Sequence, residues 1–248
     1  MAHLNFAYTD QLFVRYQLAN NPEADTIIIF GGWPSDYANK DTIEYLQEQG
    51  YHVFSALYAG IYQSEGAFLT SNPVIDYQAL IDAVNKGVID NLYTNKQEKF
   101  KTKKIVFLGS SFGGSIALGA ATKYNPDKLL LFAPVWEWSE QSGLDEEVAF
   151  AKRAFKHVYR LGFTDEKEML DLLSSYDELQ PTHYTKNITC PILVLHDPTD
   201  EIVPYQQTHA MSKQLDFKVV EHAYGHGLSE PLQTHWTVIQ EFLAKEDL

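Results

Sequence analysis

The chain has 248 residues and a formal net charge of −14, from 33 acidic and 19 basic residues. This length predicts one large α/β domain, or one domain with a modest insertion. The acidic balance repels phosphate backbones and anionic lipid surfaces, so it argues against nucleic-acid binding and membrane docking.

The N-terminal segment and the cysteine content favour a soluble, cytoplasmic protein. Residues 1–17 lack the apolar core of a signal peptide, and the longest apolar runs are too short to span a bilayer. The single cysteine, Cys190, cannot form an internal disulfide, and nothing around it indicates a cysteine-based metal site.

In chain order, short apolar runs alternate with longer segments of helical pattern. A strand pair is expected in residues 6–19, with its turn at Thr9-Asp10. Most later runs are continuously apolar, as is typical of strands buried on both faces of a parallel sheet. The six later strand candidates are Thr26–Gly32, His52–Tyr58, Lys104–Ser110, Lys128–Val135, Pro191–Asp197 and Asp216–Ala223.

Helices are expected between and after these strands. Their alternation with the strands predicts an α/β fold with a doubly wound, mostly parallel sheet and right-handed crossovers. The predicted helices are Asp36–Gln49, Val74–Tyr93, Ser111–Tyr124, Tyr205–Gln214 and Leu232–Lys245.

One connection is much longer than the others. About 55 residues separate the strand ending near Val135 from the strand beginning near Pro191, far more than an ordinary crossover needs. Helices are expected there over Leu144–Tyr159 and Asp165–Ser174, the second with Thr164 as its N-cap. We therefore predict a core of residues 1–135 and 190–248 with a helical cap insertion of residues 136–189.

The segment Gly109–Gly113 (GSSFG) fits the pattern G-x-S-x-G in one register only, with Ser111 at its centre. It follows a predicted strand and precedes a predicted helix of small residues. In this context the pattern predicts a nucleophile elbow, a strained turn that exposes the central serine above the strand ends. A plain tight turn is the alternative. A phosphate-binding loop is disfavoured because no lysine follows the glycines, and the dinucleotide pattern G-x-G-x-x-G is absent.

A nucleophilic serine needs a general base, and the base needs an orienting acid. On this type of fold the acid and then a histidine follow the serine in the chain. The loop "LHDPTDEIVP" offers Asp197 and Asp200, and the loop "EHAYGHGLSE" offers His222 and His226. A metal site of His196, Asp197 and Asp200 is an alternative, although no other ligand spacing supports it.

With these motifs the chain resembles the α/β-hydrolase superfamily, in its serine esterase and lipase-like branch. The acid loop resembles the family pattern G-x-x-D-x-x-V-P, with Asp197 in place of the glycine, and Gly225–Gly227 resembles the family's histidine loop. The resemblance implies Asp200 as the acid and His226 as the base of a catalytic triad with Ser111. It also implies the α/β-hydrolase fold over nearly the whole chain.

The resemblance further implies an oxyanion hole of two backbone N–H groups. One belongs to Phe112, the residue after the predicted nucleophile. The other belongs to the loop "FGGWPSD", which lacks the histidine usual in the family. The second donor is Trp33 or Gly32, depending on the alignment, and we favour Trp33 because Trp33-Pro34 then matches a bulky-residue–proline pair common at this place.

The aromatic residues of the predicted cap are candidate substrate contacts, unless they serve only to pack the cap against the sheet. The main candidates are Trp136, Trp138 and Tyr176, with Phe150 and Phe155 as further ones.

The expected activity is hydrolysis of carboxylic esters with small to medium acyl groups, through an acyl-enzyme and without a metal or organic cofactor. Acyltransferase, thioesterase and peptidase activities would use the same three side chains, and a non-catalytic binding protein is the remaining alternative. The expected partner is a small-molecule ester, with no nucleic acid and no membrane, and homodimer formation stays open.

Overall fold

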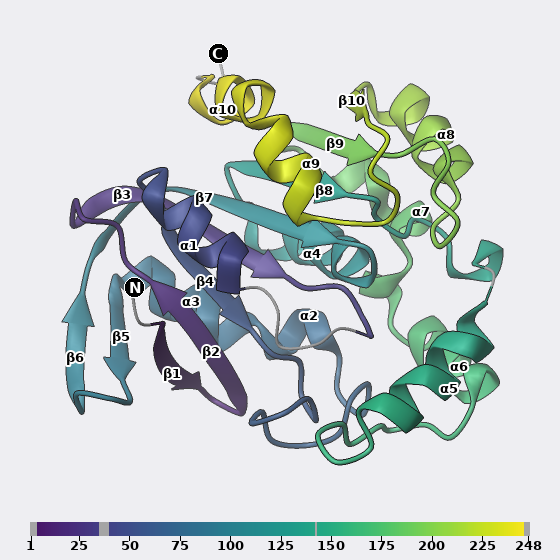
Figure 1. The fold of residues 1–248 in the computed structure, drawn as a ribbon, viewed down its shortest axis with the longest axis horizontal. Helices are drawn as coiled ribbons and strands as arrows, with labels where there is room; N and C mark the ends of the chain where they lie inside the picture. Colours follow the sequence, from purple (N-terminus) through teal and green to yellow (C-terminus); the bar gives the residue numbers. More distant parts are fainter. Residues whose placement is uncertain (1–3, 35–39, 142, 246–248) are drawn as a thin grey trace.

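The computed structural model describes residues 4–34, 40–141 and 143–245. Their main feature is an eight-stranded sheet in the order β1-β2-β4-β3-β7-β8-β9-β10 (Figure 1). The strands are β1 (Asn5–Thr9), β2 (Leu12–Gln17), β3 (Glu23–Phe30), β4 (His52–Ala56), β7 (Lys101–Ser110), β8 (Lys128–Phe132), β9 (Ile192–His196) and β10 (Lys218–Glu221).

The sheet is antiparallel at one edge and parallel elsewhere. β1 and β2 form the expected hairpin, and β2 pairs antiparallel with β4. All pairs from β4 to β10 are parallel. The prediction of a mostly parallel, doubly wound sheet is therefore confirmed.

Helices cover both faces because successive residues of a strand point to opposite sides. In β3, Ile27 and Ile29 pack in one buried cluster, and Ile28 and Phe30 pack in another. The first cluster includes side chains of α1 (Lys40–Glu48), α9 (Ser229–Thr234) and α10 (Trp236–Ala244). The second includes side chains of α2 (Pro73–Asp76), α3 (Gln78–Lys86), α4 (Phe112–Tyr124) and α8 (Tyr205–Leu215).

Three predicted helices differ from those observed. The helix expected over Leu144–Tyr159 ends at Ala154. The helix expected over Val74–Tyr93 ends at Gly87, which has a left-handed φ of 67° and whose added Cβ would lie 2.2 Å from the Phe100 carbonyl oxygen. The chain then forms β5 (Val88–Asn91), which pairs antiparallel with β6 (Lys96–Lys99). The last expected helix is divided into α9 and α10 at His235. The expected start of the first helix, at Asp36, lies outside the described residues.

The helices of the predicted cap segment lie in two places (Figure 1). The helices α5 (Leu144–Ala154) and α6 (Glu166–Ser174) lie at one end of the molecule, and α7 (Pro181–Tyr184) contacts α4 of the core. Isolated bridges from Tyr159 to Ile61 and from Leu161 to Phe68 tie the cap segment to the loop after β4. The segment also contains 3-10 turns at Trp138–Glu140, Asp177–Leu179 and Thr185–Asn187.

The N-cap of α6 is Asp165 rather than the expected Thr164. The Asp165 carboxylate accepts a hydrogen bond from the Glu168 N–H at 2.9 Å, whereas Thr164 donates its own N–H and hydroxyl to the Glu168 side chain. Within the described residues, no helix combines the length and the apolar character that crossing a membrane requires.

Candidate active site

The turn from β7 to α4 holds Ser111 in a rare backbone conformation. Ser111 follows the last residue of β7 and precedes the first residue of α4, with φ 54° and ψ −123°. Its N–H donates to the Phe132 carbonyl of β8 at 2.9 Å, which fixes the turn to the neighbouring strand. A non-glycine residue at positive φ is strained, and such strain persists only where the surrounding structure imposes it.

The glycines around Ser111 allow this turn because the backbone packs very closely there. A Cβ on Gly113 would lie 2.0 Å from the Phe30 carbonyl oxygen at the end of β3. A Cβ on Gly109 would lie 2.7 Å from the Gly113 carbonyl oxygen. Both contacts are shorter than real Cβ atoms make, so these positions require glycine for steric reasons.

The loop after β9 brings Asp200 to His226. The Asp200 carboxylate accepts the backbone N–H groups of Ile202 at 2.8 Å and Val203 at 3.0 Å through one oxygen. Its other oxygen lies 2.7 Å from His226 Nδ1. An aspartate held by two backbone donors and directed at a histidine ring nitrogen can fix the orientation of that ring and stabilise its charged form.

Asp197, the alternative acid, is directed elsewhere. Its carboxylate accepts the N–H and the hydroxyl of Thr199, each at 2.8 Å, and the Gly225 N–H at 2.6 Å. These bonds lower the pKa of Asp197 and connect its loop to the loop that carries His226. The structure therefore directs Asp200 at the histidine and gives Asp197 a contact with that histidine's loop.

The surroundings of Asp200 favour its ionised form. Burial acts to raise the pKa of Asp200, but hydrogen bonds from His196 and His226 outweigh burial, and the pKa falls well below its ordinary value. A carboxylate that stays ionised near neutral pH can balance the positive charge of a histidine that has accepted a proton.

His196 is fully buried behind this pair. Its Nε2 lies 3.3 Å from the Asp200 carboxylate and 3.1 Å from the Val203 carbonyl oxygen, and its Nδ1 lies 2.8 Å from the Thr208 hydroxyl. The Asp197 carboxylate bonds Thr199 and the Gly225 N–H. Among the described residues, no group of three His, Cys, Asp or Glu side chains is arranged to hold a metal ion. The alternative metal site of His196, Asp197 and Asp200 thus finds no geometric support.

His222, the alternative base, does not face Asp200. Its Nδ1 accepts the Tyr224 N–H at 3.3 Å within its own loop, and its Nε2 is buried without a hydrogen-bond partner among the described residues. Burial is the first cause of the lowered pKa of His222. Of the two candidate histidines, His226 is the one bonded to an acidic side chain.

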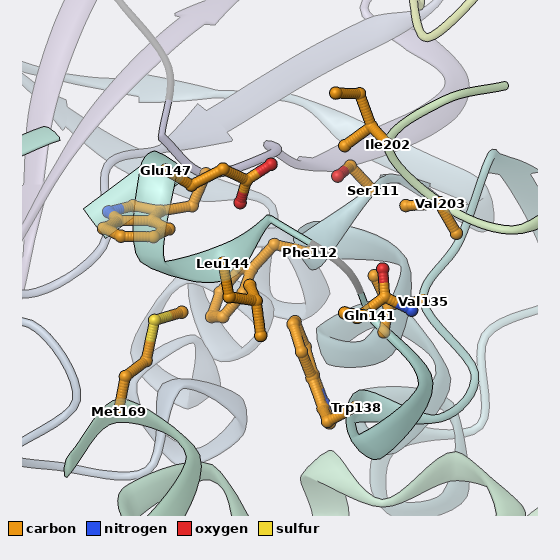
Figure 2. Close-up of a pocket in the computed structure, with 11 residues that line it drawn as sticks. Ser111, Phe112, Val135, Trp138, Gln141, Leu144, Glu147, Met169, Ile202 and Val203 are labelled. Carbon is orange, nitrogen blue, oxygen red and sulfur yellow. The ribbon is translucent and has the colours of Figure 1, made fainter. Parts of the chain in front are cut away.

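Ser111 and His226 line the same open cavity of about 780 Å³. Its wall also includes Trp33, Glu147, Phe150, Arg153 and Ile202. Among the hydrogen bonds formed by described residues, none joins the Ser111 hydroxyl to His226, whose Nδ1 is bonded to Asp200. A narrow cavity continues beside Ser111 between Phe112, Trp138, Leu144 and Met169 (Figure 2).

The loop after β3 lies against Ser111. A Cβ on Gly32 would lie 3.4 Å from the Ser111 Cβ, and Trp33 lines both cavities. The Tyr58 hydroxyl donates to the Gly31 carbonyl at 2.7 Å, and the Trp33 ring stacks on Phe68 with centroids 5.3 Å apart. The loop is thus held next to Ser111, while the choice between the Gly32 and Trp33 N–H groups as oxyanion donors stays a prediction.

The predicted aromatic contacts divide into two groups. Trp138 lines the narrow cavity, and Phe150 lines the open one. Trp136, in contrast, stacks on Phe217 and donates its indole N–H to Thr208 at 3.1 Å. The Tyr176 hydroxyl donates to the Leu69 carbonyl at 3.3 Å. Trp136 and Tyr176 do not line the two cavities beside Ser111, because their side chains pack against or bond to other residues. Phe155 does not line them either, and its ring stacks on Tyr159.

The positions of three residues relative to the site were not predicted from sequence. Tyr58 and His196 act through contacts between segments far apart in the chain, so no local pattern marks them. Glu147 is one of several acidic residues in the first turn of α5, where acidic side chains are common, so only its place in the cavity distinguishes it. Burial raises the pKa of Glu147 to about 7, and the nearby His226 acts in the opposite direction.

Comparisons with known proteins concern the family and the fold of the chain. The model of the family described as serine aminopeptidase, S33, matches residues 22–180. No curated protein sequence matches the chain. Among solved structures, Est1E from Butyrivibrio proteoclasticus is 18% identical with a TM-score of 0.64, over 98% of each chain. The Pyrococcus furiosus esterase Pf2001 is 16% identical with a TM-score of 0.66, over 96% of this chain and 90% of that one.

A third similar structure is a thermophilic esterase from Thermogutta terrifontis, with butyrate bound. It is 16% identical with a TM-score of 0.63, over 96% of this chain and 92% of that one. At these identities the solved structures share the fold with this chain, and its chemistry has to be argued from its own side chains.

Proposed function

The chain belongs to the α/β-hydrolase family described as serine aminopeptidase, S33, and we propose that it is a serine hydrolase that cleaves carboxylic esters of small to medium acyl groups. The observation that carries the proposal is the contact of 2.7 Å between His226 Nδ1 and the Asp200 carboxylate. His226 and Ser111 line the same cavity. Ser111 itself sits on a strained turn between strand and helix.

In the proposed reaction, the Ser111 hydroxyl attacks the acyl carbonyl while His226 takes its proton. Asp200 holds the ring of His226 and balances its positive charge. The protonated His226 then gives the proton to the leaving alcohol, and the acyl group remains on Ser111. Water, activated by the same histidine, releases the acid and regenerates the serine.

The oxyanion of each tetrahedral intermediate would be held by backbone N–H groups. The Phe112 N–H lies in the first turn of α4, where helical N–H groups have no partner within the helix. The second donor would be Trp33 or Gly32, from the loop that lies against Ser111. Neither donor depends on a side chain, which is why the histidine usual at this loop can be absent.

Transfer of the acyl group to an alcohol or amine is a second candidate activity, because any nucleophile that reaches the acyl-enzyme can replace water. The open cavity of about 780 Å³ beside Ser111 leaves space for such an acceptor. Product analysis with an added alcohol or amine separates hydrolysis from transfer.

The test is ester hydrolysis and fluorophosphonate labelling by the wild type and Ser111→Ala. We expect the wild type to hydrolyse p-nitrophenyl esters and to be labelled, and Ser111→Ala to lose both at an unchanged melting temperature. A panel that includes butyrate and ferulate esters would define the acyl preference, since one similar structure contains butyrate and another, of Est1E, contains ferulic acid. Labelling of the Ala variant would contradict the assignment of the nucleophile.

A further inference from the structure

Glu147 is a carboxylate of the cap that faces the candidate nucleophile. It lies in the first turn of α5 and lines both the open cavity and the narrow cavity beside Ser111. Figure 2 shows its carboxylate and the Ser111 hydroxyl directed into the same space. A substrate bound to Ser111 would therefore come close to this carboxylate.

The Glu147 carboxylate has no protein partner within the described residues, where no hydrogen bond or ion pair is formed to its oxygens. Arg153 lines the same open cavity but forms no ion pair with it there. A partly buried charge without a donor is costly, and buried polar groups in proteins normally find partners. The unused acceptor oxygens are thus available to a ligand in the cavity.

The charges around Glu147 are mostly negative. The open cavity is also lined by Glu146, Glu201 and His226, and by Arg153, which is the one arginine or lysine among its described lining residues. Burial raises the pKa of Glu147 to about 7, so the side chain is mostly ionised at pH 8 and mostly neutral at pH 6. A positively charged group of a substrate would therefore be attracted to the acidic residues that line this cavity.

We propose that Glu147 is a specificity-determining residue that makes the site prefer esters carrying an ammonium group over isosteric uncharged esters. This inference rests on the proposed ester hydrolysis at Ser111 and concerns only which esters are selected. Glu147 takes no part in the proton transfers, which His226 and Asp200 carry out. Its effect is an attraction between the carboxylate and a cation in a partly hydrated cavity.

The test uses two matched pairs of esters, because the cation can be on the alcohol side or on the acyl side. The first pair is butyrylcholine and its isostere with a tert-butyl group in place of the trimethylammonium group. The second is the ethyl ester of γ-(trimethylammonio)butyric acid and its tert-butyl isostere. The measured quantity is the ratio of kcat/KM for the charged ester to that for the uncharged ester. The permanent charge of these esters assigns any pH dependence of the ratio to the protein.

At pH 8 we expect this ratio, in at least one pair, to be about five- to tenfold higher in the wild type than in Glu147→Gln. Glu140→Gln is the matched control, because Glu140 is an exposed residue of the cap segment outside both cavities, and it should keep the wild-type ratio. In the wild type the ratio should fall between pH 8 and pH 6 as Glu147 is protonated, whereas in Glu147→Gln it should stay constant. Both esters of a pair use His226, so the ratio removes the pH dependence of catalysis itself.

The result that would overturn the inference is an equal ratio in the wild type and Glu147→Gln for both pairs at pH 8. A ratio that falls equally in Glu140→Gln would also overturn it, because the effect would then belong to the net charge of the cap. Hydrolysis of the uncharged esters reports separately on the proposed function. If these esters are cleaved only when Ser111 is intact, the ester hydrolase proposal stands whatever the charge ratios are.

Discussion

The turn that holds Ser111 and the cap helix that holds Glu147 face the same cavity but are built differently. A backbone hydrogen bond to Phe132 and the close packing at Gly109 and Gly113 fix the backbone of Ser111. Glu147 stands on a short helix, and no described residue contributes a hydrogen bond to its carboxylate. In the proposed function, the chemistry therefore depends on the rigid sheet, and the choice of substrate depends on α5.

The largest expected effect concerns the two aspartates on the sheet side of the cavity. Asp200→Asn should lower kcat/KM for a p-nitrophenyl ester by about 10³- to 10⁴-fold, because the amide can hold the His226 ring in the wrong tautomer and cannot balance its charge. Asp197→Asn should lower kcat/KM for the same ester by less than about tenfold, since Asp197 bonds Thr199 and the Gly225 N–H rather than His226. Circular dichroism and melting temperatures check that both variants fold, and a larger loss in Asp197→Asn would reassign the acid.

The next effect tests the rigidity of the Ser111 turn. Gly113→Ala should lower the free energy of unfolding by about 3 kcal/mol or more, because its Cβ would meet the Phe30 carbonyl oxygen at 2.0 Å. Gly50→Ala is the control, since Gly50 has a φ of 97° but no atom lies within 4 Å of an added Cβ. This variant should lower the free energy of unfolding by about 1 kcal/mol. Urea unfolding measures the free energy of unfolding of both variants. Equal losses would mean that the close packing at the turn can relax.

A smaller effect is expected where the cap meets the Ser111 turn. Trp138 packs on Phe112 with ring centroids 5.5 Å apart and donates its indole N–H to the buried Leu179 carbonyl at 2.9 Å. Trp138→Phe removes this donor and should lower the free energy of unfolding by about 1–2 kcal/mol. Phe150→Ala, at a cap residue that is 45% exposed, should change it by less than about 0.5 kcal/mol. If the two variants lose equal stability in urea, the Trp138 contact does not anchor the cap.

The smallest effect is a gain of stability on the cap side, in Glu147→Gln. Burial raises the pKa of Glu147 from 4.5 to about 7 in the folded chain, so the folded state binds the proton more tightly than the unfolded state. Stability therefore falls as pH rises from about 4.5 to about 7 and does not change further above that window. The glutamine variant avoids this loss.

Glu147→Gln should consequently be more stable than the wild type by about 1 kcal/mol at pH 8, a value kept small because solvent still reaches the carboxylate, and nearly equal to it at pH 4.5. Thermal unfolding at the two pH values measures the difference. A stabilisation of the same size at both values would show that the charge of Glu147 is not its cause.

The sequence was most informative where function depends on local pattern. The G-x-S-x-G spacing singled out Ser111, and the structure has it at positive φ between β7 and α4. Continuous apolar runs predicted the parallel strands, because strands covered by helices on both faces have no polar side. The predicted ends of elements were less accurate, as at Gly87, where one expected helix becomes a helix and a two-stranded hairpin.

The choice between the two aspartates shows the limit of such patterns. The family resemblance implied Asp200, but residue chemistry alone left Asp197 open, since both lie in one loop three positions apart. Only the loop's path decides which carboxylate meets His226. The aromatic residues of the predicted cap show the same limit. They were predicted to contact the substrate, but Trp136 stacks on Phe217 and the Tyr176 hydroxyl donates to the Leu69 carbonyl.

By itself, the sequence determined the mostly parallel α/β sheet, the elbow at Ser111 and the order of acid and base candidates along the chain. These depend on strand periodicity, glycine spacing and chain order, all of which are local or linear properties. The tertiary structure alone decided that Asp200 is bonded to His226, that Tyr58 holds the loop at Gly31 and that Glu147 faces the cavity. Such contacts join residues from different elements, and their geometry exists only once sheet, loops and cap have packed together.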